Sequence, residues 1–349
     1  MEKQINISKE ELKELQKFKK LYGTEKDHQE VVDFFYKVFL YAFINGNKDV
    51  IFFVKRFNEI KLQDSNFYLS RERKCERMSL YDPVFKKIYV HKDKIEHHDQ
   101  TIVFHEGMHL FHEYSSLHSH EPIEYEKQRM NTIDRILQHK ESILRELQKI
   151  SEKYDEISNK AVKYIYENYI YKIGAKNVAD YIDKEKEKYN DLIQQKDIYN
   201  KLVEMGFNQE NCKILNSKND DHELTSSELL DTLKQQKYQD KISEFSVAIE
   251  PEEIAYEGFI SAILLGEQEE WMIKYGHSKE YFQMDKENGF KEVLSHYSEL
   301  KNSSSNKKWL DILKNQLGEE FLNYIDRIYL QILTNPYHLS LESENKMGI

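Results

Sequence analysis

Cysteine, proline and glycine are all scarce in this chain of 349 residues. It contains 2 cysteines, 4 prolines and 11 glycines, whereas 32% of its residues are charged. Two cysteines, Cys75 and Cys212, cannot build a disulfide framework, which favours a reducing environment. Few helix-breaking residues among many charged ones are typical of long solvated helices. The composition therefore argues against both a disordered chain and a disulfide-rich secreted domain.

A long hydrophobic run is also missing. The most apolar stretch, residues 31–44, contains Asp33 and Lys37 and is too short to cross a bilayer. The first residues, 1–11, are polar and lack the apolar core of a signal peptide. The formal net charge of -11 argues against nucleic acid as the main partner. We therefore expect a protein without a membrane span that works in the cytoplasm, or one delivered into a host cell cytosol without a signal peptide.

The hydrophobic pattern divides the chain into three parts. Residues 1–65 predict an N-terminal helical part in which no residue suggests chemistry. We expect residues 66–122 and 245–349 to form the core domain together. Residues 123–244, with their heptad spacing, are expected to form a helical hairpin inserted into it. That insertion is either a structural arm or one that recognises a substrate. The expected fold class is α+β: mainly α with a small antiparallel β-sheet.

The predicted sheet ends close to the most apolar helix of the core. Its last strand contains Ile88, Tyr89 and Val90, and the helix is expected over residues 101–113. A free edge of this strand could pair with an extended peptide backbone and hold it beside the helix. The alternative is a hairpin with a purely structural role.

The helix over residues 101–113 contains His105, Glu106 and His109 in the pattern H-E-x-x-H. Residues four apart leave one face of an α-helix about one turn apart, so both imidazoles can reach a single Zn²⁺ ion. Glu106 lies beside such an ion and can accept a proton from a zinc-bound water. The neighbouring residues are apolar, which predicts a buried helix. A chance occurrence of the pattern is the alternative.

Two histidines leave a catalytic zinc ion one protein ligand short. Glu253 and Glu257 lie four apart in an apolar helical stretch, where a carboxylate is costly unless it is paired or metal-bound. We expect Glu253 to bind zinc and Glu257 to hold a ring N–H of a ligand histidine. Glu257 as the ligand, or a simple preference of acids for a helix N-terminus, are alternatives. His112 lies too far along the helix axis, and the nearby loop offers His118, His120, Glu121, Glu124 and Glu126.

This order of strand, H-E-x-x-H helix and a later E-x-x-x-[D/E] helix resembles the gluzincin class of zinc metalloproteases. The stretch Glu253-Ile-Ala-Tyr-Glu-Gly-Phe259 is similar to the third-ligand helix of bacterial toxin and effector proteases of the anthrax lethal factor kind. The resemblance covers about a third of the chain. It implies a zincin-like core in which His105, His109 and Glu253 bind one zinc ion and Glu106 is the general base.

The chain departs from the gluzincin pattern in two ways. His109 and Glu253 are separated by 253 − 109 = 144 positions, so the helical hairpin must be an insertion. The tyrosine that lethal-factor-like enzymes carry shortly before the ligand glutamate is missing near Ser246. The residue that stabilises the oxyanion is therefore open, and the candidates are Tyr256, Tyr297, Tyr337 and His338.

The expected function is a zinc-dependent endopeptidase that hydrolyses peptide bonds. The resemblance further implies a bacterial effector or virulence toxin that cleaves a specific host protein. A housekeeping intracellular peptidase acting on short peptides is one alternative. The other is a non-enzymatic helical interaction module in which zinc is structural or absent.

Overall fold

The chain divides into two compact units, residues 1–151 with 250–349 and residues 152–249. The first unit therefore includes residues 123–151, which the sequence pattern assigned to the inserted arm, and residues 166–244 of that arm lie outside the described part of the chain. The computed structural model describes residues 7–71, 79–91, 94–95, 99–115, 121–165, 249–267, 271, 273–274, 276–285, 287–303 and 306–334.

The secondary structure is mainly α with a small sheet, as predicted. The helices are α1 Lys9–Tyr22, α2 Gln29–Ile44, α3 Val50–Gln63, α5 Thr101–Glu113, α6 Glu121–Gln138, α7 Lys140–Ile165, α12 Pro251–Ile263, α14 Lys279–Met284, α15 Asn288–Asn302, α16 Asn306–Leu317 and α17 Glu319–Thr334. None of the helices in the described ranges is long and apolar enough to cross a membrane.

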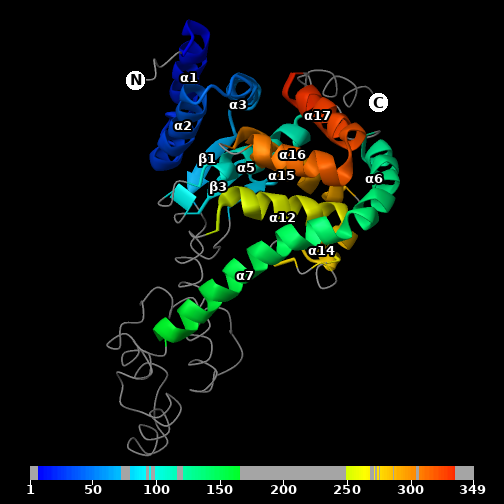
Figure 1. Ribbon diagram of the computed structural model, residues 1–349. Coiled ribbons are helices and arrows are strands. Elements are labelled where there is room, and N and C mark those ends of the chain that lie inside the picture. The colour runs from blue at the N-terminus through cyan, green and yellow to red at the C-terminus, as the bar shows by residue number, and fades with distance from the viewer. Residues whose placement is uncertain are drawn as a thin grey trace, which may run out of the picture. The chain divides into compact units, whose positions relative to one another are not determined.

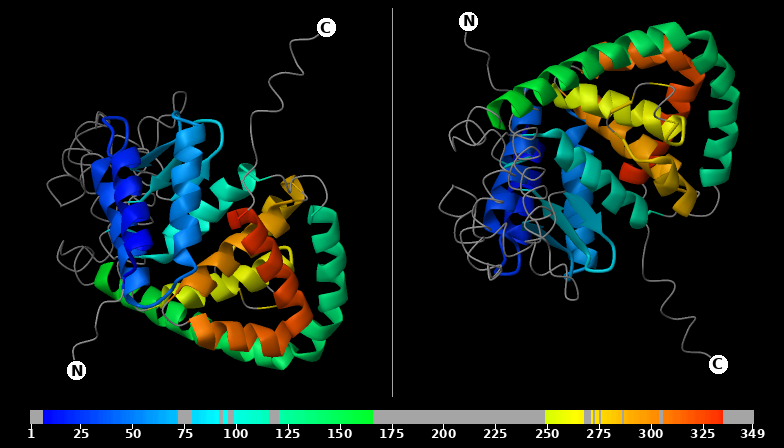
Figure 2. Two further views of the ribbon diagram at one scale, coloured as in Figure 1. Left: turned by 90° about the horizontal axis from the view of Figure 1, so that it is seen from above. Right: turned by 90° about the horizontal axis from the view of Figure 1, so that it is seen from below.

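The N-terminal helices pack directly against the helix that carries the H-E-x-x-H pattern. A capping box between Ser8 and Glu11 begins α1. Phe53 and Phe57 of α3 both contact Phe111 of α5, with ring centroids 5.0 and 4.8 Å apart. Residues 1–65 therefore share one core with α5. Figure 2 shows α5 between these helices and the helices that follow residue 250.

The sheet is mixed rather than antiparallel. Its strands are β1 Tyr68–Arg71, β2 Leu80–Asp82 and β3 Lys87–Val90, in the order β1-β3-β2. A short turn makes β2 and β3 antiparallel, whereas β1 pairs parallel to β3. The longer connection between β1 and β3 leaves either direction open, so local sequence could not decide it. The predicted free edge along Ile88–Val90 is wrong, because β3 is the central strand, and β2 is the edge strand that contacts α5.

The helix α15 lies between α5 and α12 and is buried over most of its length (Figure 1). Ser298 of α15 donates a hydrogen bond of 3.1 Å to the carbonyl oxygen of Phe104, one residue before the first histidine of the pattern. The α12 helix begins at Pro251, and proline suits the first position of a helix because its missing N–H has no partner there. The helices α5 and α15, which are distant in sequence, therefore bring polar side chains together inside an apolar core.

Candidate metal centre

Two histidines leave α5 on one face and converge. The Nε2 atoms of His105 and His109 lie 3.2 Å apart, and the two side chains are 13% and 19% exposed. The other faces of α5 are apolar and buried, and the face that carries the two histidines packs against α15. The helical spacing of four residues therefore places both imidazoles at one point.

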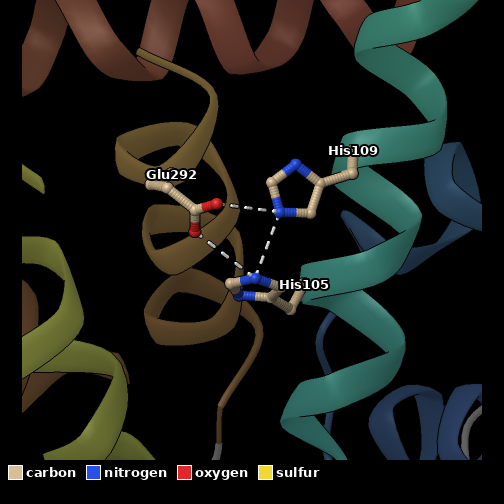
Figure 3. Close-up of side chains that lie close together, drawn as sticks. All are labelled: His105, His109 and Glu292. Carbon is tan, nitrogen blue, oxygen red and sulfur yellow. Dashed lines mark hydrogen bonds and ion pairs between the residues drawn. The ribbon is translucent and has the colours of Figure 1, made fainter. Parts of the chain in front are cut away.

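The carboxylate that faces this pair is Glu292 of α15 (Figure 3). Its Oε2 lies 3.6 Å from Nε2 of His105, and its Oε1 lies 3.6 Å from Nε2 of His109. Zinc bonds of ~2.0–2.1 Å at tetrahedral angles would place ligand atoms ~3.3 Å apart. The three side chains therefore have a spacing that one zinc ion could accept with small adjustments.

Glu253, the acid expected at this point, lies at the start of α12. Its Oε2 accepts the backbone N–H of Glu250 at 3.2 Å and completes a capping box there. Among the described residues, the groups that could hold a metal ion contain Glu292 or Glu299 and do not include Glu253. The alternative explanation of Glu253, a preference of acids for the N–H groups at a helix N-terminus, therefore accounts for its position.

Glu299 supplies the second acid that was expected of Glu257. The Oε2 atom of Glu299 lies 3.2 Å from Nδ1 of His105. With Nδ1–H donating to this carboxylate, Nε2 is the nitrogen of His105 that faces Glu292 and His109, and its deprotonation would make it a metal ligand. Glu257 is fully buried on α12, and its side chain accepts the backbone N–H of Lys274.

Glu106 is held beside the histidines by the sheet. Its side chain is buried, and Oε2 accepts the backbone N–H of Tyr81 in β2 at 2.7 Å. Burial raises the pKa of Glu106 to about 7, although His105 and the N–H of Tyr81 oppose the shift. The edge strand thus orients one carboxylate oxygen of Glu106.

The electrostatics of the cluster favour a cation. Burial by itself would lower the pKa of His105, but the carboxylates of Glu299, Glu106 and Glu292 raise it to about 10. Burial lowers the pKa of His109 to about 4. Burial disfavours an ionised Glu292, yet the surrounding histidines hold its pKa well below the usual range. Three carboxylates in one buried site make a net positive partner favourable.

One oxygen atom of Glu292 supports the same conclusion. Glu292 is 2% exposed, and its Oε2 has no hydrogen-bond donor within the part of the chain that the structure describes. A buried carboxylate oxygen without a donor is costly. A metal ion bound with His105 and His109 would satisfy it. The residues present therefore fit a zinc ion.

Two further side chains lie at the other oxygen of Glu292. Tyr281 of α14 donates a hydrogen bond of 2.7 Å to Oε1, and Nε2 of His277 lies 3.3 Å from the same atom. The rings of His277 and Tyr281 are stacked with centroids 3.8 Å apart. Neither residue belongs to a sequence pattern that indicated chemistry.

The other sequence candidates among the described residues lie outside the cluster. The hydroxyl of Tyr256 donates to Gln316 and that of Tyr297 donates to Asp326, while Tyr337, His338, His118 and His120 are outside the described residues. Glu121 accepts a hydrogen bond from Tyr324, Glu124 accepts one from Gln128, and Glu126 pairs with Arg129. His112 is buried against Phe290.

A sequence signal for the missed residues does exist. Glu292, His296 and Glu299 follow one another at spacings of four and three, so they share one face of α15. Val293, Leu294 and other apolar residues surround them, as they surround the H-E-x-x-H pattern on α5. Comparison of the chain with family models, with curated proteins and with solved structures finds no match. Function must therefore be inferred from the chemistry of the site.

Proposed function

We propose that this protein is a zinc-dependent endopeptidase, with His105, His109 and Glu292 as zinc ligands and Glu106 as general base. The convergence of two imidazole nitrogens and the Glu292 carboxylate carries the proposal. Three protein ligands of this kind are the set found at catalytic zinc ions, whereas structural zinc ions have four. Two histidines of an H-E-x-x-H helix and a later glutamate are the ligand types of the gluzincin class, although the stretch at residues 253–259 that carried the resemblance does not supply the glutamate.

The chemistry follows from the groups around the site. Zinc, when bound, lowers the pKa of water towards ~7 and polarises a carbonyl group. Glu106 takes a proton from the attacking water and passes it to the leaving amine. One of its oxygens is held by Tyr81, which leaves the other for proton transfer. The edge of β2 lies next to this base and could hold an extended peptide across the site.

Tyr281 is the strongest candidate for the oxyanion partner. It precedes Glu292 by 292 − 281 = 11 positions, a wider spacing than the 253 − 246 = 7 positions at which the resemblance led us to look for a tyrosine. Its hydroxyl is at the ligand carboxylate, whereas the hydroxyls of Tyr256 and Tyr297 bond to other helices. Movement of this hydroxyl from Glu292 to a developing oxyanion would supply a donor in the transition state.

We expect Tyr281→Phe to lower kcat by ~10²-fold or more while zinc content stays at the wild-type level. The physical reason is the loss of one hydrogen-bond donor without loss of a metal ligand. Steady-state cleavage of a fluorogenic peptide, together with metal analysis, measures both quantities. The matched control is Tyr297→Phe, which should leave kcat within a few-fold of wild type. Equal rates for the two variants would remove Tyr281 from this role.

Metal analysis of the purified wild type tests the proposed function itself. We expect about one zinc ion per chain. Peptide cleavage should be lost with 1,10-phenanthroline and should return when zinc is added. A protein that neither contains nor takes up zinc, or one that cleaves equally well without it, contradicts the proposal. The first outcome would favour the helical interaction module.

The resemblance extends the proposal to a bacterial effector that cleaves a specific host protein. Under this proposal, host-cell lysates should show one or a few new protein N-termini after incubation with the wild type, and none after incubation with Glu106→Gln. Cleavage of many unrelated short peptides without any preferred protein would instead indicate a housekeeping peptidase.

A further inference from the structure

His296 occupies the centre of the buried cluster but is not one of the three proposed ligands. It lies on α15 one turn after Glu292, and its side chain is 11% exposed. Its ring contacts that of His105, with centroids 4.7 Å apart. Its Nδ1 lies 2.6 Å from Oε2 of Glu299, and its Nε2 lies 3.7 Å from Oε2 of Glu292.

The same oxygen of Glu299 faces two imidazoles. Nδ1 of His105 lies 3.2 Å from it, and Nδ1 of His296 lies 2.6 Å from it. A carboxylate oxygen at 2.6 and 3.2 Å from two imidazole nitrogens accepts hydrogen bonds from them. Both ring nitrogens therefore act as donors. The result is a chain of hydrogen bonds from His296 through Glu299 to His105.

A second metal ion in this position is a weaker interpretation. His105, His296 and Glu299 are close enough to one another to be considered as ligands. However, two ligand atoms of a tetrahedral zinc ion lie ~3.3 Å apart, so 2.6 Å is the distance of a hydrogen bond. His105 would also have to bind two ions through its two nitrogens. The hydrogen-bonded chain requires neither adjustment.

The fold provides space for the ring of His296 at Gly258 of α12. A Cβ atom at Gly258 would lie 2.3 Å from Cε1 and Nε2 of His296 and 2.9 Å from its Cδ2. These distances are far below van der Waals contact, so any larger residue at Gly258 would displace the imidazole. Gly258 directly follows Glu257 in the stretch that resembles the lethal factor helix. Glycine at this position leaves room for the ring of His296.

We propose that His296 is a positioning residue of the metal centre, which orients His105 through Glu299, and that Gly258 makes this possible. The inference rests on the proposed zinc site. A carboxylate held by one donor can turn about its terminal torsion, whereas donors from α5 and α15 together hold Glu299 in one orientation. Glu299 in turn fixes the ring and the tautomer of His105.

Three variants test this inference through zinc affinity, measured by competition with a chromophoric chelator. His296→Leu should weaken zinc binding by ~10–100-fold, the usual effect of losing an outer hydrogen-bond partner. His296→Asn should restore most of the affinity, because its amide N–H can replace Nδ1–H. Gly258→Ala alone should weaken zinc binding. Added to His296→Asn it should have little further effect, because asparagine lacks the Cε1 and Nε2 atoms that the new methyl group would meet.

Cobalt substitution supplies a readout that is independent of activity. In the Co²⁺ protein, the ring N–H of each histidine ligand gives a shifted proton resonance whose exchange with water can be followed. The Nδ1–H of His105 should exchange slowly in the wild type and in His296→Asn, and quickly in His296→Leu. Thermal unfolding of each metal-free variant controls for a general loss of structure.

The outcomes separate the inference from the proposed function. A wild type that binds no zinc overturns both. Tight zinc binding by the wild type and equally tight binding by His296→Leu overturns only the positioning role. Equal losses in His296→Leu and His296→Asn also overturn it, since the ring would then matter only for filling space.

Discussion

Glu292→Ala is expected to reduce zinc binding by several orders of magnitude. The substitution leaves two histidines and removes the only carboxylate that faces both Nε2 atoms in the described residues. Two imidazoles without an acid form an incomplete site for zinc. The substitution leaves the histidines without one acid, but it also removes a buried carboxylate that raises the pKa of Glu106, which offsets part of the cost to the fold.

The matched control for Glu292→Ala is Glu253→Ala. Both glutamates lie on helices of the same unit, but Glu253 caps the start of α12 and should be replaceable with full retention of zinc. Mass-spectrometric metal-to-protein ratios and chelator competition on both variants measure the difference. Zinc retained by Glu292→Ala and lost by Glu253→Ala would return the third ligand to α12. If neither variant loses zinc, the metal is bound at another site.

Glu106→Gln should keep zinc and lose peptide cleavage by ~10²–10⁴-fold. The amide has the shape of the carboxylate, and its oxygen can still accept the backbone N–H of Tyr81. It cannot accept the proton of the attacking water, so the loss should appear in kcat. Peptide cleavage and zinc content measured on one preparation separate a lost base from a lost metal.

Glu113→Gln is the matched control for Glu106→Gln. It makes the same change on the same helix, at an exposed position outside the cluster. Its kcat should remain close to that of the wild type. Undiminished cleavage by Glu106→Gln would exclude this glutamate as the general base, and with it the proposed mechanism.

The first two ligands could be predicted because their geometry is local. His105 and His109 share one helix, and a spacing of four residues places them together whatever the rest of the chain does. The helices themselves were predictable for the same reason, from capping residues and apolar periodicity. The β2–β3 hairpin is also local, whereas the parallel pairing of β1 joins segments that a short turn does not connect.

The third ligand was not predictable in this way. Two apolar helices, α12 and α15, each carry acids at helical spacing, and both pack near α5. Glu253 lies at a helix start, where backbone N–H groups attract it, and Glu292 lies within α15 at the histidine pair. The same holds for the tyrosines, since the hydroxyl of Tyr281 meets Glu292 only because α14 and α15 are neighbours.

By itself the amino-acid sequence determined the helical character of the chain and the paired imidazoles of α5 with the acid beside them. These features depend on contacts within one helical turn, and the spacing of residues along the sequence is sufficient to predict such contacts. Only the tertiary structure decided that Glu292, Glu299 and His296 surround that pair and that Gly258 leaves room for the last of them. Contacts between distant helices depend on how whole surfaces pack, and no short pattern in a chain encodes that choice.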